Sequence, residues 1–531
     1  MKTSLLVSLL GLSALSDAWR PKRDYDNADY YVLHTDTSID PQDVASRLGL
    51  KYEGPLRGFN DHHVFHGDKS DDDVVRIELK ARRRRKRDVG GHDILDGVYL
   101  AKKQEARMRH EKRTIPPSPA GLKSRSIANK PTPQALEMQA NIIRELEIKD
   151  PTFDAQWHLY NTVQQGHDVN VTEVWRMGIT GKNATVAIID DGLDMYSNDL
   201  KDNYYKEGSW DFNDHDAEPK PELSDDKHGT RCAGEIGAGK NDFCGLGVAY
   251  DSRIAGIRIL SGAISDADEA EAMIYDLQNN QIYSCSWGPP DDGRAMEAPD
   301  VLIKRAMLKG VQQGRGGLGS IYVFASGNGA SNGDNCNFDG YTNSIYSITV
   351  GAVDRAGNHP YYSEHCSAQL VVTYSSGSGD AIVSLFLPLP LGSLGKIKEF
   401  TYTDHFPSIL LMLAKMPVMT VMEALQPLLH SLRESSLLSC KSDLISPGAI
   451  CNTLPCRLPP KSKIRKPTGP RLTQVTTSVT PLAMAKSIHT VLSSWLQIGR
   501  MLSLRPGTFL PGCMLGTAFR RDRPDLQRPL K

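Results

Sequence analysis

This sequence has almost no net charge, few cysteines and few long apolar runs. Its 531 residues include 62 Lys and Arg against 63 Asp and Glu, so the bulk charge indicates neither nucleic acid nor an acidic ligand as its partner. Its nine cysteines lack zinc-ligand spacing, which leaves a few disulfides as their expected use. Beyond the N-terminus no segment is a convincing transmembrane helix, because the apolar run at 409–413 is short and Lys415 soon follows it. No membrane anchor is therefore expected within this chain.

Residues 1–18 are predicted to be a secretory signal peptide. Met1-Lys2 precedes an apolar run at 5–15, and the small residues Ser16 and Ala18 follow it. The run is too short to span a membrane stably. The chain is therefore expected to enter the secretory pathway.

Residues 19–113 are predicted to be a pro-domain with a small α/β fold. Segments 30–34 and 63–66 are strand-like, and 41–48 looks helical. Charge is unevenly spread along the chain, and residues 81–113 are strongly basic.

Two basic runs close this pro-domain, Arg82-Arg-Arg-Arg-Lys-Arg87 and Arg109-His-Glu-Lys-Arg113, the second just before Thr-Ile-Pro-Pro. A basic run is usually a solvated linker or a nucleic-acid patch, and nucleic acid has little support beside a signal peptide. In a secreted chain, paired basic residues in a Pro-flanked linker favour proteolytic processing. We predict the main cut after Lys112-Arg113 and a second candidate cut at Arg87.

From about residue 135 the composition is that of a globular enzyme, with 114–145 as a linker or N-terminal extension. An apolar, β-branched run at 184–189 ends in Asp190-Asp191-Gly. A run of that length bounded by Gly is typical of a buried strand in a parallel sheet. The carboxyl ends of such strands carry the sites of α/β folds. Taken alone, however, the stretch is a turn that closes a strand.

Two further stretches change that interpretation. His228 opens a small-residue run that could enter a helix, and a second buried strand at 320–325 ends in Ser-Gly-Asn328-Gly. An Asp at a strand end, a His opening a helix and an Asn after another strand are the parts of nucleophilic hydrolysis. The Asp190 carboxylate orients the imidazole, His228 acts as general base, and the Asn328 amide donates to an oxyanion.

These motifs resemble those of subtilisin-like serine proteases. Asp190-Asp-Gly, His228-Gly-Thr-Arg-Cys and Ala325-Ser-Gly-Asn-Gly occur in the order of that family. Similarity to its kexin and furin branch, and to fungal kexins in particular, lies in Gln156-Trp-His-Leu, Ile282-Tyr-Ser-Cys-Ser-Trp-Gly-Pro and Asp339-Gly-Tyr-Thr-Asn-Ser. The resemblance runs from the signal peptide to about Gly379. It implies an α/β fold for 146–379, a subtilisin-like parallel sheet flanked by helices.

The resemblance assigns roles residue by residue. It makes Asp190 the triad acid, His228 the base and Asn328 the oxyanion donor. Substrate residues are numbered backward from the cut, so P1 is the residue just before it and P2 the one before that. Asp191 would face the P2 side chain. The further substrate-binding residues that it implies are Asp291 and Asp339 in the S1 pocket, with Glu269 and Glu297 in outer subsites. Local carboxylates suit paired Lys and Arg, because a buried cation requires a desolvated anionic partner.

The resemblance also implies Ca²⁺ as a cofactor, held by hard oxygen ligands. The implied ligands are Asp150, Asp199 and Asn241 in one site, Asp291, Asp334 and Glu364 in a second beside S1, and Asp211, Asp216 and Glu218 in a third. For the third set, a solvated acidic loop is an equally good interpretation.

Several residues outside these sites also match the family. Cys336 and Cys366 match a family disulfide, and Cys232 is expected to remain a thiol. Asn170-Val-Thr and Asn183-Ala-Thr are glycosylation sequons.

Two pro-domain histidines, His63 and His66, match where the family keeps a pH-sensing histidine. We hypothesise that their protonation in an acidifying compartment loosens the inhibitory pro-domain.

The pattern breaks at the nucleophile. A subtilisin-like enzyme needs a serine in a Gly-Thr-Ser-Ala-like motif at the head of a helix, and none follows Gly379 in this sequence. Residues 380–531 have no steady period and do not read like a domain. They are expected to be aberrant sequence, disordered or wrongly packed.

Reading the codons one base back can restore the motif. In that frame, 422–434 can encode His-Gly-Gly-Thr-Ser-Ala-Ala-Ala-Pro-Leu-Ala-Ala-Gly, with the serine codon straddling Leu425 and Gln426. Segments 408–413, 443–453 and 481–488 can encode further kexin-like sequence in the same frame. Val383-Ser384 can be encoded by GTAAGT, a consensus donor splice site. We hypothesise a retained intron, with a frameshift mutation or a sequencing error as the alternative.

The resemblance therefore implies a Ca²⁺-dependent serine endopeptidase that cuts secretory precursors after Lys-Arg or Arg-Arg pairs in a Golgi-type compartment. Its expected partners are those precursors and its own pro-domain, without nucleic acid. The chain with this sequence is expected to be inactive. The alternative is a non-catalytic pseudoprotease or inhibitor that binds basic peptides.

Overall fold

The computed structural model describes residues 22–384, apart from 90, 109, 118–129 and 378–379. Several predicted features lie outside the described residues. They are the signal peptide, Arg109 of the second basic run, the hypothesised out-of-frame serine codon across Leu425 and Gln426, and the aberrant region from 385 onward.

The predicted pro-domain contains an antiparallel sheet in the strand order β2-β3-β1-β4. Its elements are β1 (Ala28–Thr35), α1 (Pro41–Leu48), β2 (Lys51–Pro55), β3 (His62–Asp68), α2 (Val74–Val89), the 3₁₀ turn η1 (Ile94–Gly97) and β4 (Val98–Gln104). Helix α1 begins after Asp40, whose carboxylate accepts a hydrogen bond from the Gln42 N–H. It ends at Leu48 and is capped by Gly49, which has a φ of 69°. The predicted α/β pattern is therefore present here, with α1 at the expected bounds.

The basic run at 82–87 lies inside α2, so the expectation of a linker there is wrong. Arg and Lys are good helix formers. Arg82 is buried, and its Nη2 lies 2.8 Å from an Asp96 carboxylate oxygen. The candidate cut at Arg87 therefore lies in the last turn of a helix, which would have to unwind before a protease could bind it in an extended form.

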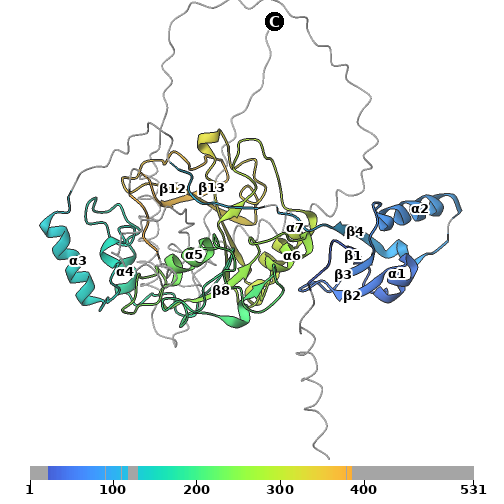
Figure 1. The fold of residues 1–531 in the computed structure, drawn as a ribbon, viewed down its shortest axis with the longest axis horizontal. Coiled ribbons are helices and arrows are strands. Elements are labelled where there is room, and N and C mark those ends of the chain that lie inside the picture. The colour runs from blue at the N-terminus through green and yellow to red at the C-terminus, as the bar shows by residue number, and fades with distance from the viewer. Residues whose placement is uncertain (1–21, 90, 109, 118–129, 378–379, 385–531) are drawn as a thin grey trace, which may run out of the picture. The chain divides into compact units, whose positions relative to one another are not determined.

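The second and larger region of the structure comprises residues 130–384. A seven-stranded sheet in the order β13-β12-β11-β9-β6-β8-β7 forms its centre (Figure 1). All its pairings are parallel. The strands are β6 (Thr185–Asp190), β7 (Trp210–Asp211), β8 (Arg253–Arg258), β9 (Ile282–Cys285), β11 (Ile321–Ala325), β12 (Ser347–Val353) and β13 (Gln369–Tyr374). This confirms the predicted subtilisin-like α/β fold.

Helices and short elements surround this sheet. They are α3 (Pro133–Glu145), η2 (Phe153–Ala155), α4 (Val171–Arg176), η3 (Lys206–Gly208), α5 (His228–Gly237), α6 (Asp266–Ala272), α7 (Val301–Gly317) and η4 (Ala330–Asn332). Backbone angles within α7 leave the helical range at Gly314. Two short strands, β5 (Glu111–Lys112) and β10 (Trp287–Gly288), pair with each other outside the main sheet.

Both faces of β6 are buried, which explains its unbroken apolar sequence. Val186 and Ile188 pack on one side with Ala233 and Ile236 of α5. Ala187 and Ile189 belong to the core on the other side.

That second core includes the helices α6 and α7 and extends into the pro-domain. Ala267 and Ala270 of α6 lie in one apolar cluster with Val32, Leu56 and Val64 of the pro-domain sheet. The pro-domain thus covers apolar surface of the larger region.

Residues 380–384, beyond the predicted boundary at 379, still pack on the larger region. The Trp157 indole donates to the Ala381 carbonyl at 2.8 Å, and the Ser384 hydroxyl donates to the Arg231 carbonyl at 2.9 Å. Both sequon asparagines, Asn170 and Asn183, are exposed. Within the described part of the chain, no helix has the length and apolar character needed to cross a membrane.

Candidate active site

The predicted acid and base meet at the carboxyl edge of the sheet. Asp190 ends β6 and His228 begins α5, and both Asp190 carboxylate oxygens lie 2.9 Å from His228 Nδ1. Both side chains are buried. The approach depends on Gly229, because a Cβ there would lie 2.3 Å from the Gly192 carbonyl oxygen. The pair has the geometry in which a carboxylate orients an imidazole for proton transfer.

Asp191, the neighbouring carboxylate, holds the start of α5. Its oxygens accept hydrogen bonds from the backbone N–H groups of Lys227 and His228 at 3.1 Å and of Gly229 at 2.7 Å. Burial, with Asp190 beside it, raises the pKa of Asp191. Cys232 lies one turn further along α5, with its Sγ 3.7 Å from His228 Nδ1 and from an Asp190 oxygen.

Asn328 follows β11 at the same edge. Its backbone N–H donates to Asp291 at 2.6 Å. Its buried side-chain amide has no hydrogen-bond partner among the described residues. An amide that is held in place with its donor uncommitted can stabilise an oxyanion.

The predicted end of the pro-domain, residues 111–113, lies along β10 beside these groups. Strand β5 pairs antiparallel with β10, with Lys112 opposite Trp287, and the Arg113 N–H donates to the Ser286 carbonyl at 2.9 Å. A polypeptide bound by adding a strand in this way is held by main-chain hydrogen bonds, while its side chains enter separate pockets.

The Arg113 side chain is buried among carboxylates. Its Nη2 lies 2.6 Å from an Asp339 oxygen, its Nε lies 3.7 Å from Asp291, and Nη1 donates to the Ala325 carbonyl. Burial acts to lower the pKa of Arg113, but Asp291 and Asp339 outweigh it and raise the pKa. Gly288 forms one wall, where a Cβ would lie 2.2 Å from the guanidinium. The pocket therefore accepts a planar cation.

Lys112 binds a separate group of carboxylates. Its Nζ lies 2.9 Å from Asp191, 3.2 Å from Asp226 and 3.3 Å from Asp225. Asp226 is a buried member of this group that sequence reasoning did not assign. Its signal was present in the Asp225-Asp-Lys-His run that leads to the base.

An outer pocket holds His110, the fourth residue before the predicted cut. His110 Nε2 lies 3.0 Å from Glu269, and its ring centroid lies 4.4 Å from that of Trp287. The Tyr341 hydroxyl also donates to Glu269. Glu297 meets the site through its backbone, since its carbonyl accepts from the Gly340 N–H at 2.7 Å while its side chain is exposed.

Two of the three predicted Ca²⁺ sites have carboxylates that suit a cation. In the first, Asp150 Oδ2 and Asp199 Oδ1 are buried without a hydrogen-bond partner among the described residues, and the Asn241 N–H donates to Asp150. Burial raises the pKa of Asp150 to about 6 and that of Asp199 to about 7. Buried carboxylates of this kind stay ionised when a cation neutralises them.

In the second predicted Ca²⁺ site, Asp291, Asp334 and Glu364 bring one oxygen each to within 4.8 Å of one another. Burial and Asp291 raise the pKa of Glu364. The oxygen-only donor set fits Ca²⁺.

The third predicted set is less suited to a metal. Asp211 is buried but already pairs with Arg258 at 2.7 Å and accepts from the Asn213 and Asp214 N–H groups. Asp216 accepts from the Glu218 N–H at 2.8 Å. The carboxylates of this loop therefore already have hydrogen-bond and ion-pair partners in the protein.

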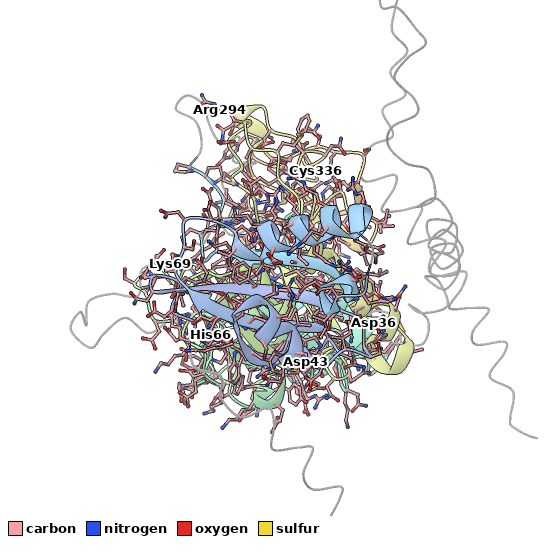
Figure 2. All side chains as sticks on the ribbon, turned by 90° about the vertical axis from the view of Figure 1, so that its right-hand side faces the viewer. Asp36, Asp43, His66, Lys69, Arg294 and Cys336 are labelled. Carbon is pink, nitrogen blue, oxygen red and sulfur yellow. A yellow bond between two sulfur atoms is a disulfide. The ribbon has the colours of Figure 1, made fainter. Side chains whose placement is uncertain are left out.

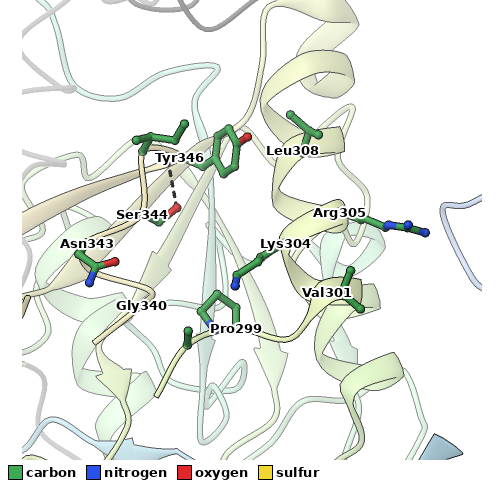
Figure 3. Close-up of a pocket in the computed structure, with 11 residues that line it drawn as sticks. Pro299, Val301, Lys304, Arg305, Leu308, Gly340, Asn343, Ser344 and Tyr346 are labelled. Carbon is green, nitrogen blue, oxygen red and sulfur yellow. Dashed lines mark hydrogen bonds between the residues drawn. The ribbon is translucent and has the colours of Figure 1, made fainter. Parts of the chain in front are cut away.

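Cys336 and Cys366 are joined by a disulfide, two residues after Asp334 and Glu364 of the second predicted Ca²⁺ site. Figure 2 labels Cys336. A separate hollow of about 410 Å³ lies at the start of α7 (Figure 3). It is lined by Pro299, Val301, Lys304, Leu308, Tyr346 and their neighbours, and its lining contains none of the cleft carboxylates.

The chain matches a family model and is similar to several known proteins. Residues 181–383 match the model of the subtilase family. The chain is 46% identical to Protease KEX1 of Kluyveromyces lactis over 383 residues, which cover 72% of this chain and 47% of that protein. It is 47% identical to Kexin of Saccharomyces cerevisiae, over 68% of this chain and 42% of that protein. The chain spans about half the length of the curated relatives that it matches.

Proposed function

The chain belongs to the subtilase family of serine endopeptidases, in its kexin-like branch, and from that premise we propose that its gene encodes a Ca²⁺-dependent enzyme that cuts secretory precursors after paired basic residues. The observation that carries this proposal is the binding of Lys112-Arg113 in two separate carboxylate pockets beside Asp190 and His228. A Golgi-type compartment is the proposed place of action.

The same geometry supports self-processing of the zymogen. Strand β5 presents the backbone of Arg113 along β10, as a substrate ending in a basic pair would be presented. The pro-domain would then be both the first substrate and, after the cut, an inhibitor that leaves its basic end in the cleft.

The proposed reaction needs the serine that the shifted frame encodes. Its hydroxyl attacks the scissile carbonyl while His228 Nε2 takes the proton and Asp190 holds the imidazole through Nδ1. The Asn328 amide donates to the oxyanion, and His228 then returns the proton to the leaving amine. A chain with this sequence has the acid and the base without the nucleophile, so we propose that it is inactive.

Sequencing the transcript across codons 375–430 tests the origin of the break. We expect an intron to be removed and His-Gly-Gly-Thr-Ser to appear in frame. An uninterrupted message matching this sequence would sink the retained-intron hypothesis. It would favour the second candidate function, a pseudoprotease that binds basic peptides, because the cleft already holds a basic pair without the serine.

Ca²⁺ is proposed to bind Asp150, Asp199 and Asn241, and Asp291, Asp334 and Glu364, where it supplies charge neutralisation and rigidity. Adding a chelator at pH 7 is expected to lower the thermal midpoint by about 5–10 °C, since a ligand at a hundred times its Kd contributes about 2.7 kcal/mol. Differential scanning calorimetry measures this. The Asp199→Asn variant should respond less, whereas Asp202→Asn, an exposed neighbour, should respond like the parent. Equal midpoints with and without chelator in the parent would refute the proposal.

A pH response is expected from His62 rather than from the two histidines that the sequence indicates. His63 and His66 contact side chains of β2: His63 Nδ1 lies 3.1 Å from the Tyr52 hydroxyl, and His66 Nδ1 lies 3.0 Å from Glu53. Figure 2 labels His66. His62 stacks on His34 at 4.6 Å, and its Nε2 accepts from Arg305 of α7 at 2.8 Å.

Burial lowers the pKa of His62 to about 4, although Asp61 acts to raise it. An ordinary histidine has a pKa of about 6.5, so the docked state favours neutral His62. Docking is therefore expected to weaken as pH falls from about 6.5 toward 4, where the docked state resists the protonation that a free imidazole would undergo. Protonation also places a cation against Arg305. With the chain cut at a protease site inserted within 118–129, the pro-segment is expected to dissociate on the order of tenfold faster at pH 5 than at pH 7.5.

Substitution separates the two histidine hypotheses. His62→Phe should remove most of the pH dependence of the dissociation rate. The double variant His63→Gln, His66→Gln should retain it. The reverse result would support the hypothesis drawn from the sequence.

A further inference from the structure

The described chain continues beyond Arg113, and its next residues also contact the larger region. Thr114 is exposed, whereas Ile115 and Pro116 are half-buried. The Tyr361 hydroxyl donates a hydrogen bond to the Pro116 carbonyl. Pro116 is the third residue after the predicted cut, the position called P3′, so this contact lies on the opposite side of the cut from the basic pair.

Tyr361 is held in place by its buried neighbour in the sequence. Its ring packs edge-on against the ring of Tyr362, with the two centroids 5.3 Å apart. Tyr362 is fully buried, and its hydroxyl donates to the Ser376 carbonyl at 2.6 Å. Burial also raises the pKa of Tyr361, so its phenol remains a hydrogen-bond donor at neutral pH. The Tyr361 hydroxyl is therefore presented from a fixed support.

The segment that carries Tyr361 is joined to the loop of the proposed oxyanion donor. The Ala330 N–H, two residues beyond Asn328, donates to the Tyr362 carbonyl at 3.0 Å. This bond fixes the position of Tyr361 relative to Asn328, which acts at the scissile carbonyl in the proposed reaction. A chain that runs from the cut toward its C-terminus therefore meets Tyr361 within a few residues.

The acceptor at this position is a group that every residue carries. A main-chain carbonyl does not depend on the side chain, and proline offers it although proline lacks an N–H. The side chains of Lys112 and Arg113 are the same in an uncut chain and in a product that ends at the cut. The Pro116 carbonyl, by contrast, leaves with the peptide beyond the cut. A contact to it can therefore distinguish the uncut chain from that product, which the carboxylate pockets cannot do.

We propose that Tyr361 forms a binding site for the main-chain carbonyl of P3′, and that this site favours uncut precursors that extend at least three residues beyond the basic pair. This rests on the proposed function and extends it. The substrate class becomes chains in which the pair is internal, rather than chains that end at the pair. A hydrogen bond of ordinary net strength corresponds to about a fivefold gain in affinity.

Displacement of a labelled pro-segment by synthetic peptides tests this in the full chain, cut within 118–129 as above. The matched pair is acetyl-His-Glu-Lys-Arg-Thr-Ile-Pro-amide and acetyl-His-Glu-Lys-Arg-Thr-Ile-pyrrolidide, which keeps the proline ring and lacks its carboxamide. Because the serine motif is absent from this sequence, the peptides are expected to remain intact during the measurement. The Pro-amide peptide is expected to displace the pro-segment at about fivefold lower concentration than the pyrrolidide.

Conservative substitutions locate the effect. Tyr361→Phe removes the hydroxyl and keeps the ring, so the concentration ratio between the two peptides should fall toward one. The ratio cancels any change in the affinity for the pro-segment itself. Tyr196→Phe alters an exposed tyrosine whose hydroxyl donates to Glu218 at 3.4 Å, and it should keep the fivefold ratio.

A third peptide tests whether the main chain is what Tyr361 binds. With Ala-amide in place of Pro-amide, the carbonyl is retained and the ring is lost, and displacement should match that of the Pro-amide peptide. A loss as large as that of the pyrrolidide would mean that the site binds the proline ring, and it would overturn the proposal.

The remaining outcomes separate this proposal from the proposed function. Equal displacement by the Pro-amide peptide and the pyrrolidide in the parent, or a ratio that persists in Tyr361→Phe, would overturn the P3′ site. If the Pro-amide peptide competes no better than its counterpart with Ser-Ser in place of Lys-Arg, the proposed cleft function fails instead.

Discussion

The protein translated from the frame-restored message is expected to cleave a Lys-Arg substrate, with a kcat on the order of a million-fold above that of a chain with this sequence. The latter should show no cleavage above background. That factor is what loss of the nucleophile costs a subtilisin-type triad. The physical reason is that Asp190 and His228 can move a proton, but they form no covalent bond to the scissile carbonyl. Initial rates on a fluorogenic peptide ending in Lys-Arg measure the difference.

Two variants of the frame-restored protein make this result specific. Replacing its serine by Ala, or His228 by Ala, should each reduce kcat by about as much as both together, because the triad acts as a unit. Cleavage after Lys-Arg by the unrestored chain, abolished by His228→Ala, would contradict the prediction and show that the described residues suffice for catalysis.

The second large effect is expected from Arg113→Ala in the chain with this sequence. The substitution should open S1 to p-aminobenzamidine, a fluorescent arginine mimic, with binding at least a hundredfold tighter than in the parent. Breaking a buried ion pair costs roughly 3–5 kcal/mol, and the Arg113 side chain is 2% exposed against Asp339. Fluorescence titration measures the affinity, and it requires no serine.

Controls for this experiment come from other pro-domain cations. Arg84→Ala, an exposed position on α2, should leave S1 closed. Lys112→Ala should have a smaller effect, because Lys112 fills another pocket and its side chain is 18% exposed. Equal binding of the probe by the parent and Arg113→Ala would mean that the pro-segment does not hold S1 in solution.

The site residues that could be predicted from the sequence lie in short contiguous motifs. Asp190 follows its strand, His228 opens its helix and Asn328 follows another strand, and parallel strands bring their carboxyl ends to one edge. Helix α1 was also predictable, because Asp40 and Pro41 are local signals for a helix start and Gly49 is one for a helix end. Patterns of this kind depend only on near neighbours along the chain.

The basic run at 82–87 shows where local reading fails. A charge run is ambiguous until its partners are known. Asp96, 14 residues further on in η1, pairs with Arg82 and makes it a buried helix residue. Similarly, two adjacent histidines cannot be ranked from sequence. Only the packing of β3 against α7 places His62 on Arg305 while His63 faces Tyr52.

The sequence by itself determined the family, the order of the acid, base and oxyanion donor, and the absence of the serine motif after Gly379. Tertiary structure decided which carboxylates meet which cations: Asp226 on Lys112, and Asp268 on Arg23, 245 residues apart. The physical reason is that a charge acquires its role from burial and from its nearest opposite charge. Both are set by chain segments distant in sequence that pack together only when the pro-domain and the larger region fold.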